Sequence, residues 1–340
     1  MPNQLNNALT LFFSLLVEAI PFLLLGVTFS SILLLFVNEQ RLVAAMPRNP
    51  LLGALAGSLV GFLFPVCECG NVPVARRLLM QQAPASVAVG FLLAAPTINP
   101  IVIWATWTAF RDQPEIVVLR VLFSLIIATL IGWVFSVQKD LRPLLQPSLT
   151  RLMPEPQPQL AMAGGVSSPL LRSGTYLMQG SGQIVSLEAT ATYGLPLPNP
   201  VKKPWSAKLR LLLENIIQEF RELGAILVLG SAIAAFVQVA IPREVVLSLG
   251  QGPVTSIVAM MVLAWVVSIC STVDSFFALS FASTFTSGSL LAFLVFGPMI
   301  DLKNISLLLT VFKPRAILYL FGLAAQLTFV LTLLINLYLG

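Results

Sequence analysis

The chain consists mostly of long apolar runs that lack the alternation of polar and apolar positions found in half-buried strands. Lipid offers no hydrogen-bond partners, so a membrane-spanning segment must satisfy its own backbone groups, as an α-helix does. A helical run of about 20 apolar residues crosses the hydrocarbon core of a bilayer. The strands of a transmembrane β-barrel alternate apolar and polar residues, so these runs argue against a β-barrel. We therefore predict an all-α polytopic membrane protein. The principal apolar runs are Leu9–Val37, Leu51–Phe64, Pro84–Phe110, Ile116–Val137, Leu223–Ile241, Pro253–Cys270, Phe276–Thr286, Leu290–Phe296 and Ala316–Tyr338.

Composition supports an integral membrane protein. Of the 340 residues, 57% are hydrophobic and 10% are charged, against about 25% charged in soluble domains. No cleavable signal is evident, because Met1–Asn7 holds no basic residue and the first apolar run is long enough to span. The net charge of +5 fits basic residues that flank spans rather than nucleic-acid binding. We expect a multi-pass protein of the inner (plasma) membrane, with the lipid bilayer as partner.

A change of composition divides the chain. Residues 138–205 are rich in Pro, Gly, Ser and Gln and predict a linker between a first transmembrane region, 1–137, and a second, 206–340. Within the linker, Thr175–Met178 and Gln183–Glu188 flank a turn sequence and predict a small hairpin. We place the linker and both termini in the cytoplasm.

The two regions resemble each other in the spacing of their landmarks. The offset between matched residues drifts only from 204 to 202 along the series. This indicates two homologous halves of about four spans each, eight in total, or nine to ten if broken segments form re-entrant hairpins. The matched pairs are Glu18 with Glu222, Gly26 with Gly230, Cys67 with Cys270, Pro96 with Pro298, and Asn99 with Asp301.

Several landmarks are helix breaks, at Pro65–Pro73, Pro96–Pro100 and Gly297–Asp301. Broken backbone at membrane depth is tolerated only where it packs in protein or lines a cavity. Paired broken segments in duplicated halves are therefore a sequence indication of a transport site.

The first break carries Cys67 and Cys69, which would point about 200° apart on a continuous helix. We expect a non-helical backbone here and a short helix capped by Asn71, so that the thiols lie at a helix N-terminus that favours thiolate. Arg76 and Arg77 would add positive potential, and Glu68 would oppose it.

In the second region Cys270, the counterpart of Cys67, lies directly before Ser271-Thr272-Val273-Asp274, which fits a capping box. Thiolates from opposed helix ends could bind a soft species such as Cu(I), Zn(II) or trivalent arsenic. A small sulfur-containing anion, attracted by helix N-termini, is the other option. With no histidine, proton coupling would depend on acids, chiefly Glu18 and Glu222. The predicted substrate-binding residues are Cys67, Glu68, Cys69, Asn71, Asn99, Cys270, Asp274 and Asp301.

Four segments carry a family resemblance: PVCECGNVPVARRL at 65–78, FLLAAPTINP at 91–100, SICSTVD at 268–274 and FGPMID at 296–301. They resemble motifs of the YraQ-type predicted permeases, the family that includes the ArsP-type organoarsenical efflux permeases. The resemblance covers the chain outside the linker. It implies an inner-membrane permease with two homologous halves and, as in the arsenical members, export of trivalent arsenicals through thiols, here Cys67, Cys69 and Cys270.

The sequence leaves two alternatives to transport open. The chain has no Walker-type phosphate loop, so a secondary transporter without a cofactor is our first hypothesis. A membrane-embedded thiol oxidoreductase is the alternative, because the one-residue spacing of Cys67 and Cys69 predicts a strained, easily reduced disulfide. A scaffold subunit without transport is the third.

Overall fold

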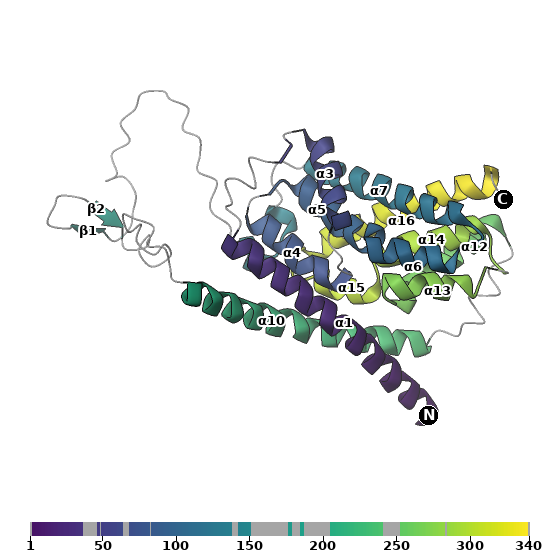
Figure 1. Ribbon diagram of the computed structural model, residues 1–340, viewed down its shortest axis with the longest axis horizontal. Helices are drawn as coiled ribbons and strands as arrows, with labels where there is room; N and C mark the ends of the chain where they lie inside the picture. Colours follow the sequence, from purple (N-terminus) through teal and green to yellow (C-terminus); the bar gives the residue numbers. More distant parts are fainter. Residues whose placement is uncertain are drawn as a thin grey trace. The chain divides into compact units, whose positions relative to one another are not determined.

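The computed structural model of the protein describes residues 2–36, 46–47, 49–63, 68–81, 83–137, 142–150, 176–178, 184–186, 205–240, 252–282 and 284–338. Nearly all of them are helical (Figure 1). Within these residues six helices are long and apolar enough to cross a membrane, and the shorter helical stretches Pro50–Phe62 and Pro253–Val267 are also apolar. This confirms the predicted all-α polytopic class.

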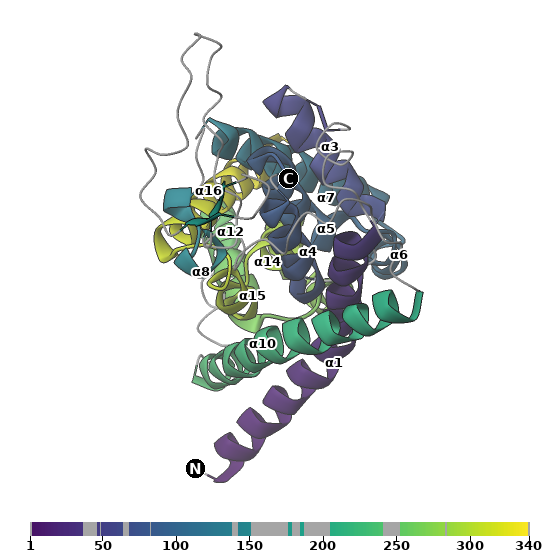
Figure 2. The ribbon, with the colours of Figure 1, turned by 90° about the vertical axis from the view of Figure 1, so that its left-hand side faces the viewer.

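The first half contains six helices in the described residues. α3, α5 and α7 pack against one another (Figure 2), and α1 packs on α4. α1 crosses α4 at Gly26, where an added Cβ atom would lie 2.1 Å from the carbonyl oxygen of Gly70. Small residues allow this close approach of backbones, as is usual between membrane helices. The helices are α1 (Pro2–Phe36), α3 (Pro50–Leu63), α4 (Glu68–Met80), α5 (Ala85–Ile98), α6 (Pro100–Ala109) and α7 (Pro114–Ser136).

The second half repeats this order of long and short helices. α12, α14 and α16 pack against one another. α10 includes the charged residues Glu214, Glu219, Arg221 and Glu222 before its apolar run, and it crosses α1 (Figures 1 and 2). The helices are α10 (Trp205–Ala240), α12 (Pro253–Val267), α13 (Ser271–Leu279), α14 (Ser287–Met299), α15 (Leu302–Leu308) and α16 (Pro314–Tyr338).

The halves meet along a shared core. α14 packs on α5 and α7, and α16 packs on α7. The short helices cross over: α13 of the second half packs on α6 of the first, and α4 of the first half packs on α15 of the second. Two contacts between short helices, α13 with α6 and α15 with α4, therefore join the two halves.

Two long apolar segments break where the sequence predicted. α5 ends at Ile98 and α6 begins at Pro100, while α14 ends at Met299 and α15 begins at Leu302. The prolines of these segments, Pro96 and Pro298, lie inside α5 and α14 shortly before their ends. Each proline removes one backbone donor from its helix, which weakens the last turn.

The predicted linker has two described parts. β1 (Tyr176–Met178) pairs antiparallel with β2 (Ile184–Ser186), which confirms the predicted hairpin. This hairpin belongs to a separate compact unit, residues 154–211.

The other part, residues 142–150, is packed against the helical bundle, and we call it the strap. It comprises η1 (Arg142–Leu144) and α8 (Pro147–Thr150). Leu145 and Leu149 are buried in the main core. The backbone N–H of Gln146 donates to the carbonyl of Val311 at 3.0 Å.

Candidate functional site

The segment that carries Cys270 forms a tight reversal between α12 and α13. Ser268 adopts a left-handed conformation, with φ 45° and ψ 40°, which is unfavourable for a residue with a side chain. Its hydroxyl donates to the carbonyl of Trp265 at 3.2 Å and accepts from the N–H of Leu302 at 3.1 Å. The start of α15 therefore holds this reversal in place.

Cys270 is the N-cap residue of α13, and it is buried. Its thiol interacts with the carboxylate of Glu18 on α1, and the hydroxyl of Thr272 donates to its sulfur at 3.7 Å. The predicted capping box is wrong: Ser271 is the first helical residue, so Asp274 falls at the fourth position rather than the third. The reversal at Ser268 sets this register. The dipole of α13 points its positive end at the thiol.

At the first break, α4 begins at Glu68, and Asn71 lies inside the helix. The prediction that Asn71 caps this helix is therefore wrong. Its side-chain amide instead donates to the carbonyl of Leu92 at 2.6 Å. That carbonyl cannot receive its usual helical hydrogen bond, because the residue four positions later is Pro96. Asn71 thus joins α4 to α5.

Cys69 is buried in the first turn of α4. Its carbonyl cannot accept the usual hydrogen bond from four residues later, because Pro73 has no N–H. Cys67 lies outside the described residues. Among the described residues, no group of three or more Cys, Asp or Glu side chains is arranged to hold a metal ion.

A buried ion pair joins α4 to α15. Lys303 Nζ lies 3.0 Å from Oε1 of Glu68, and these side chains are 2% and 1% exposed. Lys303 also donates to the carbonyl of Ser268 at 3.5 Å. Lys303 is absent from the residues that the sequence singled out. Its position two residues after a predicted break, in an apolar segment, is the signal that could have found it.

A second buried base lies where α6, α7 and α13 meet. The guanidinium of Arg120 on α7 donates to Thr106 Oγ1 at 2.7 Å, Ser275 Oγ at 2.9 Å and the carbonyl of Ser271 at 3.4 Å. Asp274 is its electrostatic partner on α13. Arg120 lies near one end of the apolar run Ile116–Val137, yet its side chain is fully buried.

Asn99 and Asp301 cap the helices that follow the two matched breaks. Asn99 Oδ1 accepts from the N–H of Val102 at 2.9 Å, and Asp301 Oδ1 accepts from the N–H of Asn304 at 2.5 Å. Asp301 interacts electrostatically with Glu68 and Lys303. The described contacts of Asn99 lie within α5 and α6.

The structure thus brings together a set of polar residues from both halves, all of them buried except the half-buried Glu18, and we call this set the break cluster. Its carboxyl groups outnumber the bases within their electrostatic reach, Lys303 and Arg120, by four to two. The break cluster consists of Glu18, Glu68, Cys270, Asp274, Asp301 and Lys303.

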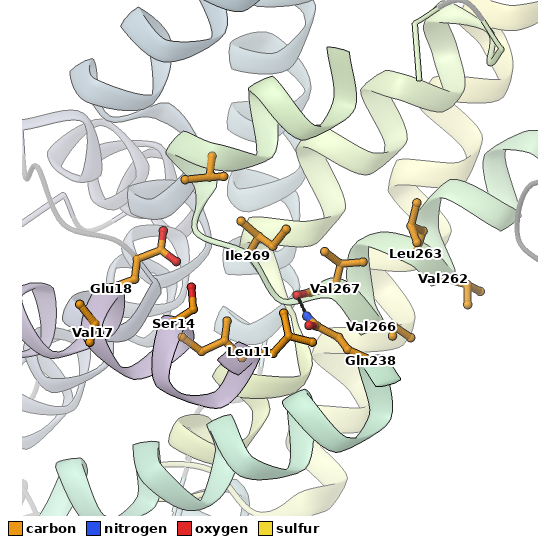
Figure 3. Close-up of a pocket in the computed structure, with 12 residues that line it drawn as sticks. Leu11, Ser14, Val17, Glu18, Gln238, Val262, Leu263, Val266, Val267 and Ile269 are labelled. Atoms are coloured by element: carbon orange, nitrogen blue, oxygen red, sulfur yellow. Dashed lines mark hydrogen bonds between the residues drawn. The ribbon is translucent and has the colours of Figure 1, made fainter. Parts of the chain in front are cut away.

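A cavity of about 560 Å³ lies beside the break cluster (Figure 3). Glu18 and Ser14 of α1 supply polar groups, and the Glu18 side chain points toward the reversal that carries Ile269. The side-chain amide of Gln238 donates to the carbonyl of Val267 at another edge. The remaining lining residues are apolar, so the cavity has a mostly apolar wall and a polar end at Glu18 and Ser14.

The predicted electrostatic residues have other partners. Arg76 forms an ion pair with Glu222 at 3.2 Å, and Arg77 forms one with Glu219 at 3.6 Å. These pairs join α4 to α10. The side chain of Glu222 is 50% exposed. The roles predicted for the two arginines at the thiols and for Glu222 in proton coupling stay predictions.

Broken helices that meet in a buried polar cluster, within a bundle of membrane-length apolar helices, define a multi-pass membrane permease. Residues 4–337 match the ArsP-type family, described as predicted permease, and the chain belongs to this family.

Two curated relatives match over nearly their whole length. The "UPF0718 protein YcgR" of Bacillus subtilis (strain 168) is 38% identical over 317 residues, which is 93% of this chain and 92% of that protein. The "Putative two-component membrane permease complex subunit" of Streptococcus mutans serotype c is 29% identical over 99% of this chain and 97% of its own. No solved structure matches the chain.

Proposed function

We propose that the protein is a secondary transporter of the plasma membrane that moves a small thiophilic solute through a site built from Cys67, Cys69, Cys270 and the acids of the break cluster. One observation carries the proposal. The thiol of Cys270 lies at the N-terminus of a broken helix, beside the carboxylate of Glu18 and a cavity. A thiol in this setting is suited to soft ligands.

The charge of the cluster favours one of the two substrate classes that the sequence left open. The four carboxyl groups of the break cluster, taken with Lys303 and the neighbouring Arg120, carry a formal charge of −2 when all are ionised. The arginines that could attract an anion, Arg76 and Arg77, already pair with acids. A soft metal or metalloid, cationic or neutral, therefore fits better than a sulfur-containing anion.

Transport would follow from movement of one half relative to the other. The reciprocal packing of α4 on α15 and of α13 on α6 supports two homologous halves related by a pseudo-two-fold axis. The equivalent caps at Asn99 and Asp301 support the same proposal. The site lies where the short helices cross, so a change at this crossing would expose it to alternate sides.

Reconstituted protein in proteoliposomes tests the proposal. Uptake of Ag(I), arsenite and thiosulfate is measured for the wild type and for Cys67→Ser, Cys69→Ser and Cys270→Ser. We expect Ag(I) or arsenite to be transported and each substitution to reduce its rate about tenfold or more. Ser280→Ala, which alters an exposed hydroxyl at the end of α13, is the matched control. Unchanged rates in all three cysteine variants would exclude the thiol site.

Thiol titration separates transport from the oxidoreductase alternative. Cys69 forms no disulfide in the structure. We expect all three cysteines to stay titratable across a redox series after denaturation. A reversible loss of two thiols together, at one potential, would instead favour an enzyme that uses Cys67 and Cys69.

A further inference from the structure

The two buried bases that link the halves are held in different ways. Arg120 donates to two hydroxyls and one backbone carbonyl, and none of these acceptors carries a charge. Lys303 faces the carboxylate of Glu68 directly, in the middle of the break cluster. A guanidinium is a rigid planar fork, whereas an ammonium is a compact charge on a flexible stem. The contact of Lys303 is therefore the one that a mobile cation can replace.

The acids around Lys303 have unused capacity for a cation. Within the described residues, Oε1 of Glu68 faces the ammonium of Lys303, while Oε2 of Glu68 and Oδ2 of Asp274 and of Asp301 accept no hydrogen bond. All three side chains are at least nine-tenths buried. Ionised carboxylates only accept, and buried acceptors without donors are costly unless a cation or proton satisfies them. Asp274 and Asp301 both interact electrostatically with Glu68.

We propose that Lys303 is a tethered cation: its ammonium occupies the cation position of the empty site, and the transported cation competes with it for Glu68. This inference rests on the proposed function, since it assumes that the break cluster is the transport site. It makes Lys303 a specificity-determining residue, because only a cation that also binds the thiols can displace a tethered competitor.

Displacement would also link binding to movement. Lys303 belongs to α15 of the second half, and Glu68 belongs to α4 of the first half. When the ammonium leaves Glu68, the ion pair across the α4–α15 crossing is lost. The hydrogen bonds of Arg120 across the α6–α13 crossing do not involve the cation. The α4–α15 crossing is therefore the one that opens.

Silver binding to the full-length protein in detergent tests the competition. Dissociation constants for Ag(I) are measured for the wild type, Lys303→Gln, Lys303→Arg and the double variant Lys303→Gln/Glu68→Gln. We expect Lys303→Gln to bind Ag(I) about tenfold tighter than the wild type, because the competing charge is gone. Lys303→Arg keeps the competing charge as a rigid guanidinium, so it should bind Ag(I) no tighter than the wild type. The double variant should lose the gain.

A second probe covers the case in which Lys303→Gln does not fold. Lys303→Ala removes the stem as well as the charge, which leaves space for a small amine. We expect propylammonium to raise the unfolding temperature of Lys303→Ala, but not that of the wild type or of Lys303→Ala/Glu68→Gln.

The two proposals fail in different ways. Silver binding to the wild type that is unaffected by Cys69→Ser and Cys270→Ser would contradict the thiol site. Thiol-dependent binding that is no tighter in folded Lys303→Gln would overturn the tethered cation alone. Absence of propylammonium rescue in Lys303→Ala, where Lys303→Gln is not folded, would overturn it as well.

Discussion

Asn99 and Asp301 occupy the same structural position, the N-cap of the helix that follows a break, although they lie in different halves of the chain. Each uses its side-chain oxygen to accept the N–H three residues later. A helix that begins inside a packed bundle has no water to satisfy its first donors, so a side chain must do so.

Removing either cap should destabilise the bundle. We expect Asn99→Ala and Asp301→Ala each to reduce the free energy of unfolding by about 1 kcal/mol. Asn99→Asp and Asp301→Asn keep the acceptor and serve as controls for the cap itself. Unfolding temperatures in detergent measure the effect. Equal losses for alanine and for the amide–acid exchange would contradict a capping role.

Loss of Arg120 should be severe because it leaves Asp274 buried without its base. We expect Arg120→Met to cost about 3–5 kcal/mol. Adding Asp274→Asn should restore part of this loss, since it removes the uncompensated charge. Arg111→Met, at an exposed arginine shortly before α7, should have almost no effect. A double-mutant cycle of unfolding free energies measures the coupling, and additive effects would contradict the pair.

The two ion pairs between α4 and α10 should contribute unequally. Glu219 is 15% exposed in its side chain and also accepts from the hydroxyl of Ser30 at 3.3 Å. Glu222 is 50% exposed, and exposed pairs contribute about 0–1 kcal/mol. We therefore expect Glu219→Gln to lower the unfolding temperature more than Glu222→Gln. Salt should weaken the Glu222 pair more strongly. The reverse order would contradict this assignment.

The crossing of α1 and α4 should not tolerate a side chain at Gly26. The added Cβ atom would lie 2.1 Å from the Gly70 carbonyl oxygen, so the backbones must move apart. We expect Gly26→Ala to destabilise the protein by about 3 kcal/mol. Gly224→Ala is the matched control, because nothing lies within 4 Å of its Cβ position. That change should be neutral or stabilising by about 0.5–1 kcal/mol, since alanine favours a helix. Equal folded yields and unfolding temperatures for the two variants would refute the close crossing.

The sequence predicts the breaks well because their causes are local. Pro96 removes a backbone donor from its own helix, and Asn99 caps the next one, so a few neighbouring residues decide the result. The same local reasoning fails for Asn71. Its cap propensity competes with the carbonyl of Leu92, which Pro96 deprives of its donor. Only the packing of α4 on α5 reveals that competitor.

The partners of the charged residues in the site could be identified only from the tertiary structure. Glu68 was expected to oppose the arginines that follow it, but the packing of α15 on α4 gives it Lys303 as partner. Arg120 resembles an ordinary residue at the end of a span until α6 and α13 bury it. Pairs between residues far apart in sequence leave no local pattern, so periodicity and spacing cannot predict them.

The strap has a practical consequence for the architecture of the chain. Residues 142–150 continue directly from the first half, yet Leu145 forms a β-bridge with Phe312 of the second half. The backbone N–H of Lys313 donates to Leu144, and its ammonium donates to Pro143. The first half thus carries its own adaptor for the second. If the gene were divided after codon 150, the first of the two co-expressed polypeptides would keep the strap as a segment that docks on the second. Division before codon 142 would instead separate the strap from the first half.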